Sequence, residues 1–195
     1  MSIHIQTVCG HAIEPWLEAL AGLRIQVFRD WPYLYDGTLE YEHTYLQRYT
    51  DSAQGLMVLA LEDDVLVGAS SGLPLRDADP EFRKPFARSL PLPEEIFYFG
   101  ESVLDVSYRG QGLGHRFFDQ REAFAREQGF AMATFCAVQR PADHPARPAQ
   151  ARALEPFWLG RGYAPLSGKL CAFHWRDIGQ TQDSMKPMQF WGKWL

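Results

Sequence analysis

The apolar positions of this chain recur with two different periods, and the period changes several times along the sequence. Residues 3–8 alternate apolar and polar side chains, which predicts a half-buried strand. Residues 14–28 and 39–49 repeat apolar or aromatic side chains at helical spacing, and Pro15 suits the first turn of the earlier helix. One strand and two helices are therefore expected at the start of the chain.

Apolar runs in the middle of the chain predict strands. Residues 56–61 and 65–73 flank three acidic residues and are expected to form a hairpin. Residues 96–104 are a further run, and residues 131–138 carry no charge, which is typical of a central strand covered on both faces. Residues 76–94, rich in proline and in charges of both signs, predict a loop or a short irregular helix.

A helix between these last two strands is expected to end at Gln128, with Gly129 as its C-cap. The prolines of residues 139–148 then predict a loop, followed by a short helix at residues 149–159 and a last strand at residues 169–175. The order of elements is β-α-α-β-β-β-α-β-α-β, which predicts a mixed α/β fold.

Length and composition fit one domain of residues 1–195, with a core at about residues 3–175. The tail, residues 176–195, is expected to pack on the body because its aromatic side chains would otherwise lie in water. It could also cover a neighbouring copy, which leaves a homodimer open. The aromatic residues concerned are Phe190, Trp191 and Trp194.

Composition also limits location and partners. No apolar run approaches the 18 residues of a membrane span, and the N-terminus lacks the basic and apolar regions of a signal peptide. The three cysteines form no CxxC pair and no cluster with zinc spacing, so we expect no metal and reduced thiols in a cytoplasm. A formal net charge of −5 argues against nucleic acid as the main partner.

Residues 109–115, RGQGLGH, place three glycines between a predicted strand and a predicted helix. Such a turn exposes backbone N–H groups at the positive end of the helix dipole and favours phosphate. A P-loop would need Lys and Ser/Thr after Gly114, and a dinucleotide-binding loop would need a third glycine where His115 or Phe117 stands. A glycine-rich turn without a ligand remains the other interpretation.

The spacing that does fit is Arg-x-x-Gly-x-Gly, read from Arg109 to Gly114. It resembles the acetyl-CoA pyrophosphate loop of the GNAT superfamily of N-acetyltransferases, which follows the fourth strand of that fold. Residues 157–163 resemble the family's late signature of two aromatics followed by Gly-Phe/Tyr. The resemblance covers about residues 3–175, apart from 76–94, and implies a mixed, mostly antiparallel sheet flanked by helices.

The resemblance implies acetyl-CoA as the co-substrate, held mainly by backbone. The N–H groups of residues 111–115 would bind the pyrophosphate, while Arg109 adds charge or braces the loop. Residues 102–104 would pair with the pantetheine amides, and the N–H near Leu104 would polarise the thioester carbonyl. The implied cofactor-binding residues are Ser102, Val103, Leu104, Arg109, Gly110, Gln111, Gly112, Leu113, Gly114 and His115.

Amine acetylation also requires a base, because only about one lysine-like amine in a thousand is uncharged at neutral pH. Glu101 is the candidate catalytic residue. It stands beside Gly100 in an otherwise apolar strand, and a glycine there indicates a bulge or the close approach of a ligand. Many GNAT members have a base-like glutamate on this strand. The alternative is an exposed or salt-bridged strand glutamate.

The general acid is less evident. The family's tyrosine, at the second aromatic of the late signature, is Trp158 here, which has no transferable proton. The thiolate could also leave unassisted. Weaker substitutes, each with a structural interpretation, are Tyr163, Tyr98, Cys136 and His144.

The acceptor side is expected at residues 31–41 and in the proline-rich segment 76–94. Residues 30–64 contain eight acidic residues and one arginine. In the family the first two helices and their connecting loop form much of this side. An acidic rim with aromatic side chains suits a cationic amine, on a small molecule or a peptide. A solvated helix face is the competing interpretation. The expected substrate-binding residues are Trp31, Tyr33, Tyr35, Asp36 and Tyr41.

These observations predict an N-acetyltransferase that moves an acetyl group directly from acetyl-CoA to an amine. The alternative is a GNAT-fold sensor or regulatory module that binds acyl-CoA without turnover, an interpretation favoured by the missing late tyrosine. A nucleotide-binding protein is disfavoured by the missing lysine and the missing third glycine of the loop.

Overall fold

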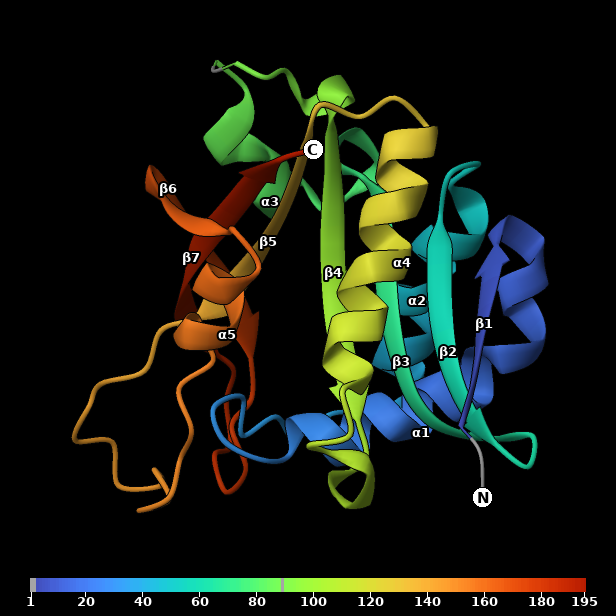
Figure 1. Cartoon of the computed structure of the whole chain (residues 1–195). Coiled ribbons are helices and arrows are strands. Elements are labelled where there is room, and N and C mark those ends of the chain that lie inside the picture. Colours follow the sequence, from blue (N-terminus) through green and yellow to red (C-terminus); the bar gives the residue numbers. More distant parts are fainter. Residues whose placement is uncertain (1–2, 89) are drawn as a thin grey trace.

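The computed structural model describes residues 3–88 and 90–195 (Figure 1). Its helices are α1 (Leu17–Phe28), α2 (Leu39–Asp51), α3 (Pro80–Arg83), α4 (Leu113–Glu127) and α5 (Glu155–Gly160). Its strands are β1 (His4–Cys9), β2 (Leu56–Glu62), β3 (Val65–Pro74), β4 (Ile96–Leu104), β5 (Met132–Val138), β6 (Ala164–Trp175) and β7 (Ser184–Trp194). Short 3₁₀ helices cover residues 10–16, 75–77, 84–86, 93–95 and 106–108.

The described strands form one seven-stranded sheet in the order β1-β2-β3-β4-β5-β7-β6. Only β4 and β5 are parallel; the other neighbours are antiparallel. The predicted fold class, a mostly antiparallel mixed sheet flanked by helices, is confirmed. The predicted hairpin is also present, and its turn residues Asp63 and Asp64 both have positive φ, as a tight two-residue turn requires.

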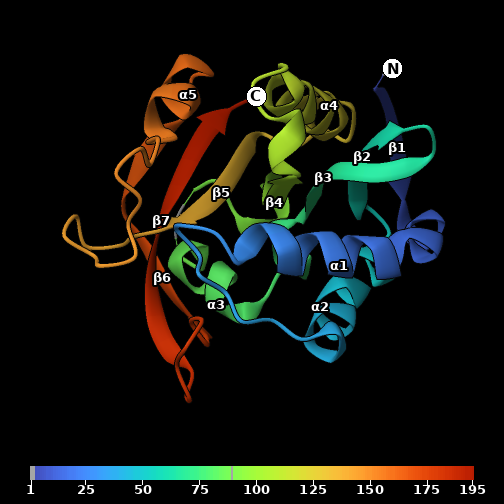
Figure 2. The same cartoon turned by 90° about the horizontal axis from the view of Figure 1, so that it is seen from below.

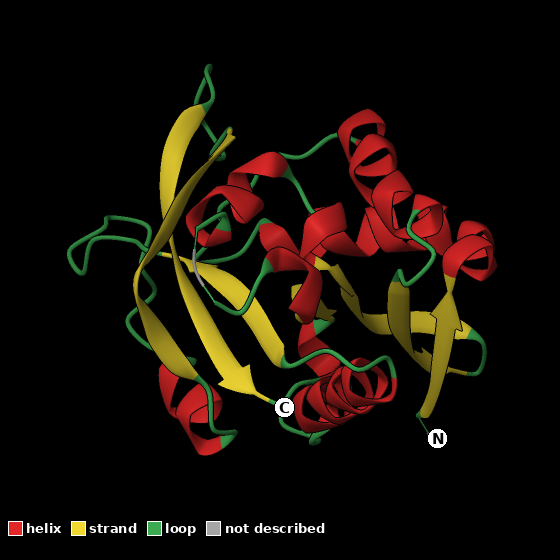
Figure 3. Cartoon of the chain, turned by 90° about the horizontal axis from the view of Figure 1, so that it is seen from above, coloured by secondary structure: helices red, strands yellow, loops and turns green. Residues whose placement is uncertain are grey.

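Helices cover both faces of the sheet. Figure 2 shows α4 and α5 on one side and α1, α2 and α3 on the other, and Figure 3 shows the strands running between these layers. Within β2, Leu56 and Val58 belong to the core under α4. Met57 and Leu59, which alternate with them, belong to the core under α1 and α2. Both faces of this strand are buried, which explains its uninterrupted apolar run.

The predicted order lacked a seventh strand, which is the C-terminal β7. This strand lies between β5 and β6 and pairs with both. Lys186 and Pro187 interrupt the apolar pattern and concealed it. Lys186 is only 3% exposed. Its amine lies 3.2 Å from Asp177 and donates to the Trp175 carbonyl, so its charge is compatible with burial.

Two further elements differ from the prediction. The expected helix at 149–159 is only the six residues of α5, because Pro156 fits only the first turn of a helix. The last predicted strand, at 169–175, is the second half of β6. Pro165 and Gly168 disturb the alternation in its first half, where the register against β7 also shifts.

A bulge in β4 shapes the centre of the sheet. The register between β3 and β4 shifts between Ser70 and Gly72. Two residues of β4, Gly100 and Glu101, therefore stand opposite Ser71 alone. A bulge of this kind bends the strand and re-aims its side chains.

Before the bulge β4 pairs with β5, and after it the two strands separate. Their pairing covers only Ile96, Phe97 and Tyr98. Beyond Tyr98, no described strand pairs with β4 on its β5 side, so this edge of β4 stays open from the bulge to Leu104.

We expect Gly100→Ala to destabilise the protein by about 1–3 kcal/mol, the usual cost of overpacking. An added Cβ would lie 2.5 Å from Ser71 Oγ and closer still to the Tyr49 hydroxyl. Gly22→Ala is the matched control, because Gly22 is exposed in α1 with no atom within 4 Å of the added Cβ. That change should be neutral or slightly stabilising. Urea unfolding measures the unfolding free energy of both variants. Equal changes in this free energy would show that the bulge tolerates a side chain.

Candidate active site

The glycine-rich loop lies between the end of β4 and the start of α4. Gly110 and Gly112 have φ of +78° and +79°, which a residue with a side chain rarely adopts. Gly112 is the N-cap of α4, and its carbonyl accepts the N–H groups of His115 and Arg116. The loop therefore turns sharply and delivers the chain directly into a 15-residue helix.

Several N–H groups of this loop have no internal acceptor. Those of residues 111–114 donate no hydrogen bond within the described part of the chain. They stand at the positive end of the α4 dipole, where an anion is stabilised. Arg109 is half-exposed beside them, and its Nε donates to the Leu104 carbonyl at 3.4 Å. The loop thus has free donors that suit a pyrophosphate.

The open edge of β4 leads from this loop to the bulge. Ser102, Val103 and Leu104 lie along it, as the sequence placed them. Backbone groups without a strand partner can pair with an extended ligand as an added strand would.

Arg121 of α4 supports the bulge from behind. Its side chain is buried and donates to the carbonyls of Ser71 and Glu101 and to the Ser102 hydroxyl. Its guanidinium carbon also lies 4.3 Å from the ring centroid of Phe99. Burial lowers the pKa of Arg121 to about 10, so the group stays charged at neutral pH.

A cavity of about 90 Å³ lies on the opposite face of β4, at the bulge. It contains the predicted base Glu101 and three of the predicted substrate-binding residues, Tyr33, Tyr35 and Tyr41. Phe82 of its wall belongs to the segment 76–94 expected on the acceptor side, and the other lining residues were not predicted to contact an acceptor. The further lining residues are Arg24, Phe28, Tyr45, Phe82, Tyr98, Gly100, Cys136, Phe173, Trp175 and Met188.

Two predicted substrate-binding residues lie elsewhere. Trp31 packs against His144, with ring centroids 5.3 Å apart. Asp36 accepts a hydrogen bond from Arg176 at 3.0 Å and lies 3.6 Å from Arg29. Neither lines the cavity, so the structure separates them from the three tyrosines.

Glu101 is both salt-bridged and part of the cavity wall. Its side chain is 8% exposed, and Oε2 lies 2.8 Å from Arg24 Nη1. The same oxygen accepts the hydroxyl of Tyr45 at 3.0 Å and that of Tyr49 at 3.4 Å. Oε1 accepts no hydrogen bond from the described residues. One oxygen is therefore anchored, and the other remains available to a ligand or a water molecule.

Hydroxyl and thiol groups around the cavity stay protonated. Burial raises the pKa values of Tyr33, Tyr35 and Tyr45. It also raises that of Cys136, whose sulfur lies 3.2 Å from the Tyr98 hydroxyl. These groups are neutral at pH 7 and can donate hydrogen bonds, but they are poor bases.

Trp158 and Tyr163, from the late signature at residues 157–163, both pack against core side chains. Trp158 packs between Phe135 and Trp191, with ring centroids 5.0 and 5.1 Å away. Tyr163 is buried on the α4 side and donates to Glu122 at 3.3 Å. Both lie in the core under α4, on the face of the sheet opposite the cavity.

A buried ion pair fixes the loop that carries the cavity tyrosines. Arg140 pairs with Asp177 at 2.8 Å and donates to the carbonyls of Pro32 and Tyr33. The Trp175 indole donates to the same Tyr33 carbonyl at 3.0 Å. The loop between α1 and α2 is thereby tied to β6 and to the residues after β5. No local sequence signal marks the contacts of this loop, because Arg140 and Trp175 lie over 100 residues from the carbonyls that they bind.

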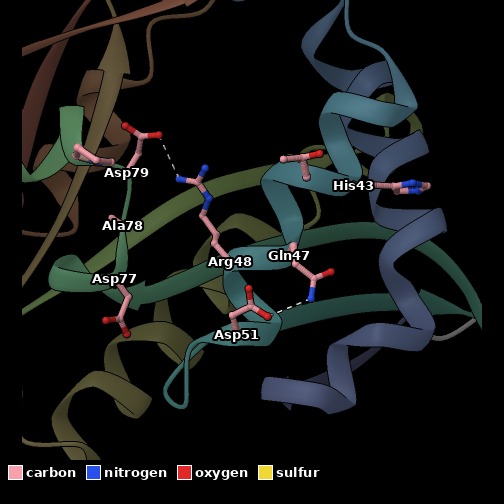
Figure 4. Close-up of a pocket in the computed structure, with 9 residues that line it drawn as sticks. His43, Gln47, Arg48, Asp51, Asp77, Ala78 and Asp79 are labelled. Atoms are coloured by element: carbon pink, nitrogen blue, oxygen red, sulfur yellow. Dashed lines mark hydrogen bonds and ion pairs between the residues drawn. The ribbon is translucent and has the colours of Figure 1, made fainter.

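A larger hollow of about 600 Å³ lies outside α2, between that helix and residues 77–80 (Figure 4). Figure 4 shows Arg48 reaching from α2 toward Asp79, at 3.7 Å, and Gln47 bonded to Asp51. Residues 77–80 belong to the segment 76–94 expected on the acceptor side, but none of the individually predicted site residues lines this hollow. The smaller cavity, which touches the β4 bulge, is therefore the better candidate for chemistry.

Within residues 3–88 and 90–195, no group of three or more His, Cys, Asp or Glu side chains could hold a metal ion. None of the described helices is long and apolar enough to cross a membrane.

Comparison with known proteins identifies the family. A model of the acetyltransferase (GNAT) family matches residues 23–154, which include the glycine-rich loop and Glu101. No curated protein gave a significant sequence match.

Solved structures share the fold at low sequence identity. A ribosomal-protein-alanine N-acetyltransferase from Brucella melitensis has a TM-score of 0.61 and 17% identity, covering 98% of this chain and 99% of that one. The PaiA N-acetyltransferase from Thermoplasma acidophilum, in complex with coenzyme A, has a TM-score of 0.57 and 14% identity over the whole of both chains. An N-acetyltransferase from Staphylococcus aureus has a TM-score of 0.61 and 11% identity, covering 98% of each.

We expect Arg140→Met to destabilise the protein by about 1–3 kcal/mol, because Asp177 then keeps Lys186 as its one cationic partner and the Pro32 carbonyl loses its donor. Arg29→Met is the control, since Arg29 is 52% exposed and 3.6 Å from Asp36. An exposed pair of this kind contributes less than about 1 kcal/mol. Chemical unfolding at pH 7 compares the two, and similar losses would contradict a special role for Arg140.

The same ion pair predicts a pH dependence. Burial alone would raise the pKa of Asp177, but hydrogen bonds from Arg140 and Lys186 outweigh it and lower the pKa. A lowered pKa stabilises the fold above the unfolded value, near 3.9, and this stability is lost as the pH falls through the folded value. The difference in unfolding free energy between wild type and Arg140→Met should therefore narrow below about pH 4. A constant difference from pH 7 to pH 3 would contradict this.

Proposed function

Because the chain belongs to the GNAT acetyltransferase family, we propose that it is an N-acetyltransferase that moves an acetyl group directly from acetyl-CoA to an amine. The observation that carries the proposal is the path along β4. The open strand edge runs from the free donors of the glycine-rich loop to the cavity that contains Glu101. A donor-binding groove and an acceptor pocket thus meet at one bulge.

The proposed donor site consists of backbone. The N–H groups of residues 111–114 would hold the pyrophosphate, with Arg109 adding positive charge at the rim. The edge at Ser102, Val103 and Leu104 would hold the pantetheine chain, whose thioester supplies the activated acetyl group. Gly110, His115 and the remaining loop residues shape the turn. The unpaired N–H groups of residues 111–114 support this fit, whereas the His115 N–H donates to the Gly112 carbonyl.

Glu101 is the proposed general base. An ammonium acceptor would give up a proton to Oε1, and the neutral amine nitrogen would then attack the thioester carbonyl. Leu104, the proposed N–H donor to that carbonyl, is three residues from Glu101, about 10 Å along a strand. A base at Glu101 would therefore act through bridging water. As the C–S bond breaks, the nitrogen loses its second proton and the departing thiolate takes up one proton, so that the products are the amide and the free thiol. Glu101 then returns its proton to solvent.

A binding module without turnover is the second candidate. The Arg24 salt bridge on Glu101 favours it, as does half-buried Trp158, which packs against Trp191 where the family has a tyrosine. A thiol-release assay with a panel of amines separates the two candidates. Release above the hydrolysis background supports the enzyme, whereas acetyl-CoA binding without release supports the module.

We expect Gly114→Asp to weaken acetyl-CoA binding at least tenfold, which is about 1.4 kcal/mol. The new carboxylate would repel the pyrophosphate, while the Cβ itself meets only Phe157, at 3.6 Å. Gly22→Asp adds the same charge to the exposed face of α1 and should leave affinity unchanged. Calorimetry on the folded variants measures their affinity for acetyl-CoA. Unchanged affinity in Gly114→Asp would remove the loop from the donor site.

We expect Glu101→Gln to lower kcat by about 10²–10⁴-fold, the usual contribution of a general base. Affinity for acetyl-CoA should change little, and the residual rate should rise with pH as free amine becomes available. Glu40→Gln, on the exposed surface of α2, is the control. A near-wild-type kcat at pH 7 in Glu101→Gln would mean that the site supplies only positioning.

A further inference from the structure

A buried cluster of charges adjoins the aromatic cavity. Arg24 of α1 pairs with Glu42 of α2, and it also lies 2.8 Å from Glu101 of β4. The side chains of Arg24, Glu42 and Glu101 are exposed by 7%, 0% and 8%. Two carboxylates therefore share one guanidinium in a place that water barely reaches.

Each of these carboxylates keeps one oxygen without a partner. Glu42 Oε1 is fully buried and accepts no hydrogen bond of normal geometry from the described residues, although the Tyr35 hydroxyl lies close enough to this carboxylate to raise the pKa of Tyr35. Glu101 Oε1 accepts none either, since the contacts of that carboxylate all reach Oε2. The negative charge beside the cavity is thus only partly compensated, and a buried charge without a partner is costly.

The remaining cavity wall supplies no further cation. It consists of aromatic side chains, Cys136 and Met188, and burial keeps its tyrosines and its thiol protonated. Such rings attract a cation over their faces. Arg24 already uses two of them, at 4.2 Å from the Tyr45 centroid and 5.0 Å from that of Phe28.

The nearest other cations do not line the cavity, although three of them lie over rings of its wall: Arg48 is 4.5 Å from the Tyr45 centroid, and Arg140 and Lys186 are 5.8 and 5.1 Å from the Trp175 ring. Arg121 lies on the opposite face of β4 and donates to main-chain carbonyls. Arg140 and Lys186 both pair with Asp177. Arg48 lies outside α2 beside Asp79. None of these four cations lines the cavity.

We propose that the cavity binds a small alkylammonium group and that Glu42 is the residue that makes it selective for a cation. Glu42 neutralises Arg24, so that Glu101 remains for the incoming ammonium. The cavity has a volume of about 90 Å³, below the roughly 150 Å³ of a cavity that holds benzene. The alkylammonium group is therefore expected to carry only a short aliphatic chain. The inference rests on the proposed amine acetylation and names the acceptor class and its specificity determinant.

Propylammonium and 1-propanol test the proposal directly, because they have the same number of heavy atoms and differ in charge. Each is titrated into the wild-type protein at pH 7, without acetyl-CoA and at constant ionic strength, and followed by amide NMR shifts. Propylammonium should bind at least tenfold more tightly and shift residues around the cavity. Equal dissociation constants, or shifts confined to another surface, would overturn the proposal.

Variants then test whether Glu42 causes the preference for propylammonium over propanol. In Glu42→Gln the preference for propylammonium should fall to within about threefold, and Glu40→Gln, an exposed neighbour on the same helix, should keep it. A retained preference in Glu42→Gln would overturn the role of Glu42. Thermal unfolding establishes that each variant is folded. If Glu42→Gln does not fold, Glu101→Gln removes the other carboxylate of the cluster and should abolish the preference in the same way.

The two proposals can fail separately. If the protein prefers propylammonium but transfers no acetyl group, the proposed enzyme fails and the cation site stands. If it acetylates methoxyamine, which is neutral at pH 7, as fast as propylamine and binds propylammonium no better than propanol, the cation site fails and the enzyme stands.

Discussion

The separation of β4 from β5 after Tyr98 is the constraint on which the rest of the site depends. A sheet with every strand paired would leave no backbone for a ligand and no cavity between its helices. The bulge at Gly100 and Glu101 opens the sheet, and it persists because packing on both faces supports it. The Tyr49 hydroxyl fills the space where a Cβ would stand, while Arg121 bonds to the carbonyls behind. The opening is thus part of the core packing and does not depend on a flexible loop.

Three buried arginines hold the pieces of the site together, and each is satisfied differently. Arg24 lies between carboxylates of α2 and β4, so it joins two elements through ion pairs. Arg121 has carbonyl and hydroxyl acceptors, which fixes the shape of the bulge without neutralising its own charge. Arg140 combines both kinds of partner and ties the tyrosine loop to β6. Burying a charge is unfavourable unless each donor is used, so these contacts make the site intolerant of local rearrangement.

Sequence reasoning found the parts of this protein that rest on local rules. The hairpin turn, the helix that starts at the glycine-rich loop, and the uncharged central strand β5 all follow from short patterns. β7 was missed because Lys186 and Pro187 break its pattern, and only the Asp177 partner, supplied by tertiary structure, makes the lysine compatible with burial. The predicted site was likewise partial. Tyr33, Tyr35 and Tyr41 reach the cavity with Glu101, but Arg24 sits in an apolar helix, where nothing local indicates that it faces β4.

The two faces of β4 differ in charge, and this difference connects the fold to its chemistry. The face toward α1 and α2 holds two carboxylates around Arg24, whereas the face toward α4 holds Arg121 with no carboxylate among its hydrogen-bond partners. A proton acceptor therefore stands on one side of the strand and a fixed positive charge on the other. The open edge that would hold the thioester runs between them. Acetyl transfer to an ammonium requires removal of a proton and stabilisation of negative charge on the carbonyl oxygen, two demands that a single uniform environment could not meet. By bulging, β4 would present different surroundings to the proposed acceptor and the proposed donor while both lie against the same few residues.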